Sequence, residues 1–367
     1  MNPFTVTYRK GYFCDRNIEV EQLKANVDNG LNTLVHSPRR MGKTALILHL
    51  FDELKNTKEY DCLFIDLFST QNMEGLIRIL AEKVLETYHS RNFLKGISSI
   101  LKGLSPSLSV SADGTPSLSL NIEENQYETT LDHIFKYLEK RKKKVIVAFD
   151  EFQEVAEYPE KAEAILRTYI QQLRNVQFIF SGSSNHLLQE MFSSAQRPFY
   201  QSSEVLVLDK LKRVAYAEFI THMFIQNKKN VDDDALEYIL DFTDSYTYYT
   251  QVICNQLFYK TKSKLSKAEA IVNTNLYIES RKADYQSLLN LLPDNQKRLA
   301  IAIANEEIVS SPTALEFLTK YKLPSASSSL LAINTLNKKE IVYKKSDGFV
   351  IYDVFFKRFL QRYYPLR

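Results

Sequence analysis

Along the first two hundred residues, short apolar runs alternate with longer stretches in which apolar positions recur every three or four residues. The short runs are typical of buried strands, and they lie at 31–37, 61–68, 145–151, 176–182 and 203–211. The longer stretches are typical of helices, and the clearest lie at 18–28, 74–88, 161–175 and 186–192. Repeated alternation of strand and helix favours right-handed crossovers and helices on both faces of a parallel sheet. We therefore expect an α/β core with a parallel five-stranded sheet.

Two regions depart from this alternation. Residues 100–126 alternate polar and apolar positions around Asp113-Gly114, which predicts a β-hairpin inserted into the core. Between residues 212 and about 285 the apolar positions have helical spacing, and we expect no strand between the helices there. The sequence therefore predicts a core at 1–211 and an all-helical domain at 212–285.

The last eighty residues predict a third domain, at 286–367. Helical patterns at 294–305, 312–321 and 326–338 precede a two-strand ribbon at 340–353 that turns at Asp347-Gly348. Three helices followed by a β-wing are typical of a winged helix-turn-helix domain.

The composition is that of a globular protein. Of 367 residues, 44% are apolar and 25% charged, which excludes disorder and collagen-like repeats. A net charge of +3 is too small for a protein that coats nucleic acid. The three scattered cysteines and six histidines show no disulfide framework and no ligand spacing, so we expect a reducing compartment and no zinc. Without a signal-peptide pattern or a membrane-length apolar run, we expect a cytoplasmic protein that does not enter a membrane.

The strongest chemical signal is the segment Ser37-Pro38-Arg39-Arg40-Met41-Gly42-Lys43-Thr44, between a predicted strand and a predicted helix. It matches the phosphate-binding P-loop except that Ser37 replaces the first glycine. Gly42 can turn backbone amides toward an anion at the helix N-terminus. Lys43 can supply charge for the β- and γ-phosphates, and the Thr44 hydroxyl can ligate Mg²⁺. A chance helix start is the simpler alternative, and the strand–loop–helix context favours nucleotide binding.

An acidic pair ends the predicted strand at 145–151. Because ligands bind at the carboxyl ends of strands in open α/β sheets, Asp150 is a candidate to hold Mg²⁺. Glu151 is a candidate to orient and deprotonate the water that attacks the γ-phosphate. Capping of the following helix is the alternative, and the P-loop about a hundred residues earlier favours the catalytic interpretation.

The next strand ends in Ser181-Gly182-Ser183-Ser184. If it lies between the strands that carry the P-loop and Asp150, then Ser181 or Ser183 reaches the γ-phosphate or the attacking water. A Ser-rich helix N-cap is an equally good and compatible interpretation.

Phosphoryl transfer also needs an arginine near the charge that develops in the transition state. The candidates are Arg39, Arg40, Arg167, Arg174 and Arg197. Arg197 follows the Ser-rich strand and precedes Pro198, which would hold it on a fixed turn. The alternative is that Arg197 is an ordinary surface arginine in contact with solvent.

Together these motifs resemble the AAA+-like P-loop ATPases of the archaeal-type group, within the STAND class of signal-transducing NTPases. The segment at 13–23 is similar to the N-terminal FxxRexEl box of that family, a helix that packs beside the adenine, and the segment at 37–47 to its GPRRxGKTSLI loop. The resemblance covers nearly the whole chain and implies a P-loop NTPase core, a helical lid and a winged helix. It implies that ATP or ADP contacts Arg16, Ser37, Pro38, Arg39, Arg40, Met41, Gly42, Lys43, Thr44 and Ala45.

The chain departs from the family in the lid. There the family has a Gly-His-Pro-Tyr-Tyr-like sensor, whereas this chain has Ser245-Tyr246-Thr247-Tyr248-Tyr249. Without the glycine and the proline, we expect the nucleotide state to be coupled to lid closure differently or weakly. Some relatives carry a nuclease-like C-terminal extension, whereas this sequence ends in FFKRFLQRYYPLR, so we do not expect nuclease activity.

The predicted winged helix has two interpretations. Residues 286–367 carry twelve Lys or Arg and seven Asp or Glu, which suits DNA. The candidate contacts are Ser327, Ser328, Asn334, Lys338, Lys339, Lys344 and Lys345. The groove helix contains no arginine, the most common base reader, so a module that binds protein is the alternative.

We expect an Mg²⁺-dependent ATPase that acts as a slow conformational switch, read out by the lid and the winged helix. The catalytic candidates are Lys43, Asp150, Glu151, Ser181, Ser183 and Arg197, and the metal ligands are Thr44 and Asp150. The alternative is a nucleotide-gated DNA-binding regulator in which hydrolysis is incidental. Candidate partners are a further copy of the chain and a protein that reads the switch.

Overall fold

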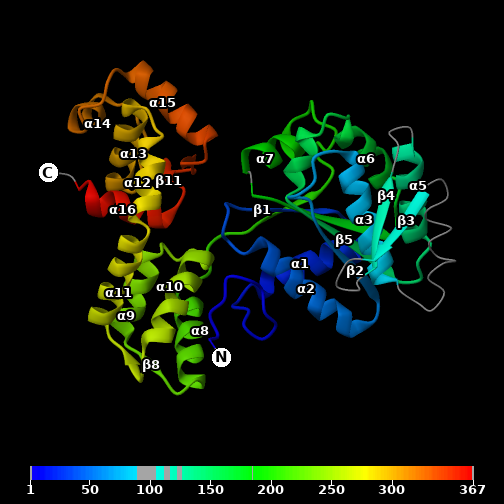
Figure 1. Ribbon diagram of the computed structural model, residues 1–367, viewed down its shortest axis with the longest axis horizontal. Coiled ribbons are helices and arrows are strands. Elements are labelled where there is room, and N and C mark those ends of the chain that lie inside the picture. The colour runs from blue at the N-terminus through cyan, green and yellow to red at the C-terminus, as the bar shows by residue number, and fades with distance from the viewer. Residues whose placement is uncertain (1, 89–104, 111–115, 122–125, 184, 366–367) are drawn as a thin grey trace. The chain divides into compact units, whose positions relative to one another are not determined.

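The computed structural model describes residues 2–88, 105–110, 116–121, 126–183 and 185–365. They fall into two compact units, one of Thr7–Lys210 and one of Met1–Val6 with Leu211–Arg367. Figure 1 shows the helices and strands of both units. Each unit has its own buried apolar residues.

A five-stranded sheet forms the centre of the first unit. Its strands run in the order β2 (Tyr60–Asp66), β5 (Lys144–Asp150), β6 (Val176–Ser181), β1 (Thr33–His36) and β7 (Glu204–Val207). Every neighbouring pair is parallel, which confirms the predicted α/β fold. Because β6 lies between β1 and β5, the segments that follow these three strands meet at one edge of the sheet.

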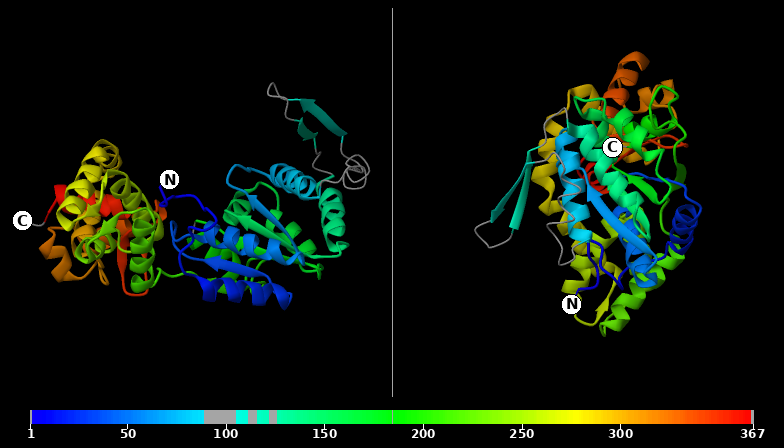
Figure 2. Two further views of the ribbon diagram at one scale, coloured as in Figure 1. Left: turned by 90° about the horizontal axis from the view of Figure 1, so that it is seen from below. Right: turned by 90° about the vertical axis from the view of Figure 1, so that its right-hand side faces the viewer.

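Helices cover both faces of this sheet (Figures 1 and 2). The elements in chain order are α1 (Asn17–Asp28), α2 (Lys43–Thr57), α3 (Met73–Thr87), α5 (Tyr127–Glu139), the 3-10 helix η2 (Phe152–Glu157), α6 (Ala162–Ile170) and α7 (Asn185–Ser193). Helix α1 packs on α2, whereas α3, α5, α6, η2 and α7 pack one against the next.

A cluster of phenylalanines anchors the turn after β5. Phe152, the first residue of η2, is fully buried, and its ring lies 4.6 Å from that of Phe180 on β6 and 5.2 Å from that of Phe199. Aromatic pairs at such separations add stabilisation beyond the area they bury. The apolar residues of the strands therefore hold the backbone that carries the acidic pair.

Two further strands lie in the predicted insertion. β3 (Ser105–Val110) and β4 (Pro116–Asn121) pair antiparallel and form a two-stranded sheet of their own. The predicted turn at Asp113-Gly114 lies outside the described residues.

The second unit is mainly helical. It contains α8 (Arg213–Gln226), α9 (Asp233–Phe242), α10 (Thr247–Lys260), α11 (Lys267–Ser280), α12 (Lys282–Asn290), α13 (Asp294–Glu306), α14 (Leu315–Lys320), α15 (Ala326–Lys338), β10 (Val342–Lys344), β11 (Phe349–Ile351) and α16 (Val354–Tyr363). The antiparallel pair of β10 and β11 follows three helices, as predicted for a winged helix. The first residues of the chain also belong to this unit, because Phe4 is fully buried against Phe224 and Phe258.

The prediction of helices alone at 212–285 was wrong. β8 (Asn230–Val231) and β9 (Lys264–Leu265) form a short parallel pair between the helices. Strands of two residues are too short to leave an alternating apolar pattern, so the sequence does not reveal them. The sequence analysis also assigned no element to α16, whose phenylalanines Phe355, Phe356 and Phe359 are buried.

Polar contacts join the helices before residue 285 to the winged helix. Asp244, after α9, pairs with Lys357 and with Arg358 of α16, the latter at 2.9 Å. Lys357 is only 5% exposed, and its burial lowers the pKa of its ammonium group. The hydroxyl of Tyr246, at the start of α10, bonds that of Tyr343 on β10. These contacts make the helices and the winged helix a single unit.

In the portion of the chain that the structure describes, every helix is too short or too polar to cross a bilayer.

Candidate active site

The P-loop segment connects β1 to α2. Gly42 precedes the helix with φ 95°, a left-handed conformation that glycine adopts without strain. Arg40 also has a positive φ, of 69°, whereas Ser37 does not. A serine is therefore tolerated at the position where the P-loop pattern has its first glycine, because the backbone there needs no left-handed turn.

Lys43 begins α2, and its side chain folds back over this loop. Nζ donates to the carbonyl oxygens of Ser37 at 2.8 Å and Pro38 at 3.1 Å, and lies 3.3 Å from Oγ of Ser37. The residue is only 7% exposed. Burial lowers the pKa of Lys43 to about 8, although the nearby charges of Asp150 and Glu151 raise it, and Arg39 lowers it further.

Nucleotide affinity should therefore fall as the pH rises above about 8. Phosphate oxygens stabilise protonated Lys43, so the bound enzyme keeps a proton that the free enzyme loses above that pH, and binding must then take up a proton. Linkage predicts a loss of up to about tenfold in affinity per pH unit. Titration with a fluorescent ATP analogue at several pH values between 7 and 9.5 measures this dependence of affinity on pH. Lys43→Met is the control, and its remaining affinity should not depend on pH in this range. A flat profile for the unaltered protein would contradict the prediction.

Asp150 lies at the end of β5 and joins the loop to β6. Its Oδ2 accepts from Oγ1 of Thr44 at 2.6 Å, and its Oδ1 accepts from Oγ of Ser181 at 2.6 Å. The backbone N–H of Glu151 also donates to Oδ1, at 3.1 Å. The structure thus brings together three of the predicted side chains in one network of hydrogen bonds.

Glu151 follows with a strained backbone and a well-held side chain. Its φ is 55°, a left-handed conformation that is uncommon for residues other than glycine. Its Oε2 accepts from the backbone N–H of Ser183 at 3.1 Å, from the Ser183 hydroxyl at 2.7 Å and from Nε2 of Gln153 at 2.6 Å. The predicted pair of Glu151 and Ser183 is therefore in direct contact, and Ser184 lies outside the described residues.

Two polar residues at this edge escaped the sequence analysis. One is Gln153, which has no motif of its own. The other is Asp66, which ends β2 in register with Asp150. Burial raises the pKa of the Asp66 carboxyl, the N–H of Phe68 lowers it, and the charges of Asp150 and Glu151 raise it further. The acidic residue near the end of the apolar run at 61–68 was the signal by which the sequence could have identified Asp66.

The candidate arginines lie in different surroundings. Arg197 pairs with Glu163 at 2.7 Å and Glu190 at 2.9 Å, so its guanidinium joins α6 to α7. Arg39 lies near enough to Lys43 to lower its pKa. Arg16 is buried just before α1 and donates to Glu19 at 2.8 Å. Of the remaining predicted loop residues, Met41 is buried and Arg40 is exposed.

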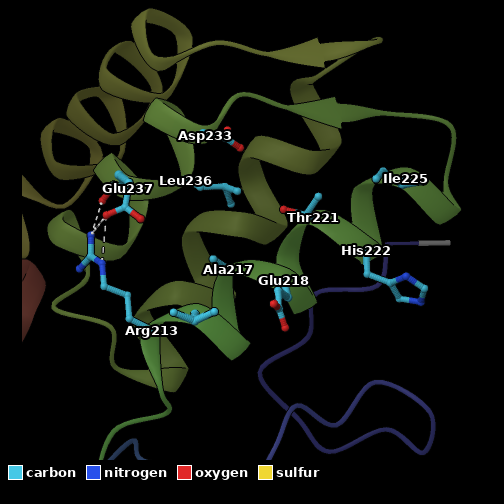
Figure 3. Close-up of a pocket in the computed structure, with 10 residues that line it drawn as sticks. Arg213, Ala217, Glu218, Thr221, His222, Ile225, Asp233, Leu236 and Glu237 are labelled. Carbon is cyan, nitrogen blue, oxygen red and sulfur yellow. Dashed lines mark hydrogen bonds and ion pairs between the residues drawn. The ribbon is translucent and has the colours of Figure 1, made fainter.

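A separate groove of about 640 Å³ lies on the second unit between α8 and α9 (Figure 3). Val214, Ala217 and Leu236 supply part of its apolar lining. Its arginine, Arg213, already pairs with Glu237 at 2.6 Å and with Asp241 at 2.8 Å. The groove therefore offers less to a phosphate than the loop before α2, where Lys43 is a buried cation at the start of a helix.

Comparisons with known proteins agree with this geometry. Residues 13–253 match the model of a family described as an ATPase domain predominantly from Archaea, and residues 283–362 match a probable winged helix domain. None of the curated proteins matches the sequence.

Several solved structures have a similar fold. A Walker-type ATPase of Pyrococcus abyssi aligns over 98% of this chain and 99% of its own, with 18% identity and a TM-score of 0.65. The ORC2 protein of Aeropyrum pernix, solved with ADPNP and ADP, covers 98% of both chains with 15% identity and a TM-score of 0.59. The ORC1 protein of the same organism, solved with DNA, covers 97% of this chain and 95% of its own with 12% identity and a TM-score of 0.50. At such identities these similarities establish the fold alone.

Proposed function

Because the chain belongs to the family of ATPase domains found predominantly in Archaea, and is thus an ATP-hydrolysing P-loop enzyme, we propose that it works as a slow, Mg²⁺-dependent conformational switch of the STAND type. The observation that carries this proposal is the linkage of Asp244 to Lys357 and Arg358. Through it, a movement of the helices next to α9 would carry the winged helix along. The finer division of this unit into a lid at 212–285 and a winged helix at 286–367 is part of the proposal.

Thr44 and Asp150 fit the proposed Mg²⁺. Both offer hard oxygen atoms, which Mg²⁺ prefers, and they already lie within 2.6 Å of each other. Among the residues that the structure describes, no cluster of three His, Cys, Asp or Glu could hold a metal. Mg²⁺ is commonly bound by one or two carboxylates together with waters and substrate phosphates, so a site of this kind is complete only with the nucleotide.

The remaining side chains have distinct proposed roles. Lys43 would leave the carbonyls of Ser37 and Pro38 for the β- and γ-phosphates, whose charge a bound Mg²⁺ would also help to neutralise. Ser181 would fix the orientation of Asp150, and Glu151 would accept a proton from the attacking water. Arg39 is the candidate within this chain to stabilise the transition state, because its charge lies close enough to Lys43 to lower the pKa of that residue.

A change of distance between the two units, controlled by ATP, would test the switch. Lys24 and Lys338 are exposed and suit paired dyes on introduced cysteines, with Cys14 and Cys62 changed to Ser. We expect the energy transfer with a non-hydrolysable ATP analogue to differ from that with ADP, and Lys43→Ala to show no difference. Equal transfer in both states, with normal turnover, would contradict the switch and leave the ATPase unaffected.

A nucleotide-gated DNA regulator is the second candidate. Lys338 and Lys344 are exposed on α15 and the wing, and the ORC1 protein of similar fold was solved with DNA. However, Leu330 and Leu331 are 52% and 69% exposed on α15, a face better suited to a protein partner than to base edges. Duplex binding that weakens steeply between 50 and 200 mM salt, and less steeply after Lys338→Ala, would favour DNA.

A further inference from the structure

Gly182 allows an unusually close approach of another side chain. A Cβ atom added at this position would overlap Oε1 of Gln153 and lie 3.1 Å from its Cδ. The φ of Gly182 is not in the left-handed region, so the backbone itself does not require glycine. The side chain of Gln153 therefore lies directly over the backbone at residue 182, in the space that any other residue would fill.

Gln153 uses this space to reach the acidic pair. It is 5% exposed, and its Nε2 donates to Oε2 of Glu151 at 2.6 Å. The opposite orientation of the amide would bring two oxygen atoms together, so the electrostatics favour this one. Among the described residues, Oε1 of Gln153 has no hydrogen-bond donor.

Within the residues that the structure describes, three donors to Glu151 bind the same carboxylate oxygen. Gln153 and the two groups of Ser183 approach Oε2, whereas Oε1 accepts none of these bonds. Donors from both η2 and the end of β6 fix the carboxyl group and distinguish its two oxygens. Such fixed orientation is what a general base needs, because proton transfer depends steeply on geometry.

We propose that Gln153, admitted by the missing side chain at Gly182, is a positioning residue for ATP hydrolysis that holds Oε2 of Glu151 and so presents Oε1 to the attacking water. This inference rests on the proposed role of Glu151 as the base. Oε1 takes one proton of the water, whose oxygen forms the bond to the γ-phosphorus. The bond from that phosphorus to the β–γ bridging oxygen breaks, its electron pair leaves with ADP, and Glu151 passes the proton to the released phosphate.

A double-mutant cycle tests the proposal in the full chain. We expect Gln153→Ala to lower kcat roughly 10- to 100-fold, as small misplacements of catalytic groups do, with ATP affinity unchanged. Gly182→Ala should have a similar effect, because it displaces the glutamine. In the Gln153→Ala background, Gly182→Ala should change kcat less than about twofold, since coupled residues are not additive. The measurements are kcat and KM for Mg·ATP, and equilibrium binding of a fluorescent ATP analogue.

Leu188 provides the matched control, because an added Cβ at Gly182 would also lie 2.7 Å from its Cδ1. If Gly182→Ala acts by displacing Leu188 instead, its effect will disappear in a Leu188→Ala background and persist in the Gln153→Ala background. That result, or a kcat of Gln153→Ala within twofold of the unaltered enzyme, would overturn the proposal. Glu151→Gln distinguishes a failure of this proposal from a failure of the base assignment. Normal turnover by Glu151→Gln would contradict the role of Glu151 as the base. If Glu151→Gln is inactive while Gln153→Ala turns over normally, only the role of Gln153 is contradicted.

Discussion

Replacing Glu151 by Gln should slow ATP turnover by roughly 10²- to 10⁴-fold, the usual contribution of a general base, while ATP binds as tightly as before. The amide has the same shape as the carboxyl group and can still accept from Ser183, so the end of β6 should keep its place. What it lacks is an oxygen basic enough to take a proton from water. Steady-state hydrolysis and equilibrium binding on the same preparation measure the two properties separately.

The control for this substitution is Glu157→Gln. Glu157 is the last residue of η2 and is exposed, so its loss removes the same charge from the same segment without touching the network at the sheet edge. Its turnover should equal that of the unaltered protein. Turnover that survives Glu151→Gln would show that another group, or the γ-phosphate itself, accepts the proton.

Replacing Lys43 by Ala should lower turnover by roughly 10²- to 10³-fold, the range found when one preorganised donor is removed from a developing charge, and should also weaken ATP binding. Lys43 is the buried cation of the loop, and its ammonium group already lies against two carbonyl oxygens that a phosphate would replace. The measurements are the rate of phosphate release and the affinity for a fluorescent ATP analogue.

Lys55 gives the matched control, because it lies on the same helix with 65% of its side chain exposed. Lys55→Ala should leave both the rate and the affinity unchanged. The Lys43→Ala protein should remain folded, since the substitution also removes an ammonium group whose burial is unfavourable. Normal hydrolysis by folded Lys43→Ala protein would place the phosphates elsewhere.

Much of the core could be predicted because the relevant signals are local. A buried parallel strand is a short apolar run, and the acidic or hydroxyl residues that follow it must reach the same edge of the sheet. For this reason the sequence alone predicted that Thr44, Asp150 and Ser181 lie near one another, and the structure shows them joined by hydrogen bonds. Their catalytic roles stay predictions until the substitutions are measured.

The rest depended on contacts that no local pattern contains. The position of Gln153 follows from the left-handed backbone at Glu151 and from the space at Gly182, two features 31 residues apart that only the fold combines. Arg197 pairs with carboxylates on two different helices. The turn predicted from Pro198 could not indicate these partners, so it did not show where the guanidinium lies. Ser245 likewise adopts φ 55°, a conformation suited to the glycine that the family has there.

The chain passes between its two units twice, once near Thr7 and once near Leu211, because Phe4 and its neighbours are held by the second unit. A single connection between two bodies leaves them free to move as far as that connection reaches. A second connection adds a further constraint, because any movement must then be compatible with both. The N-terminal segment around Phe4 therefore tethers the first unit to the second independently of the connection near Leu211.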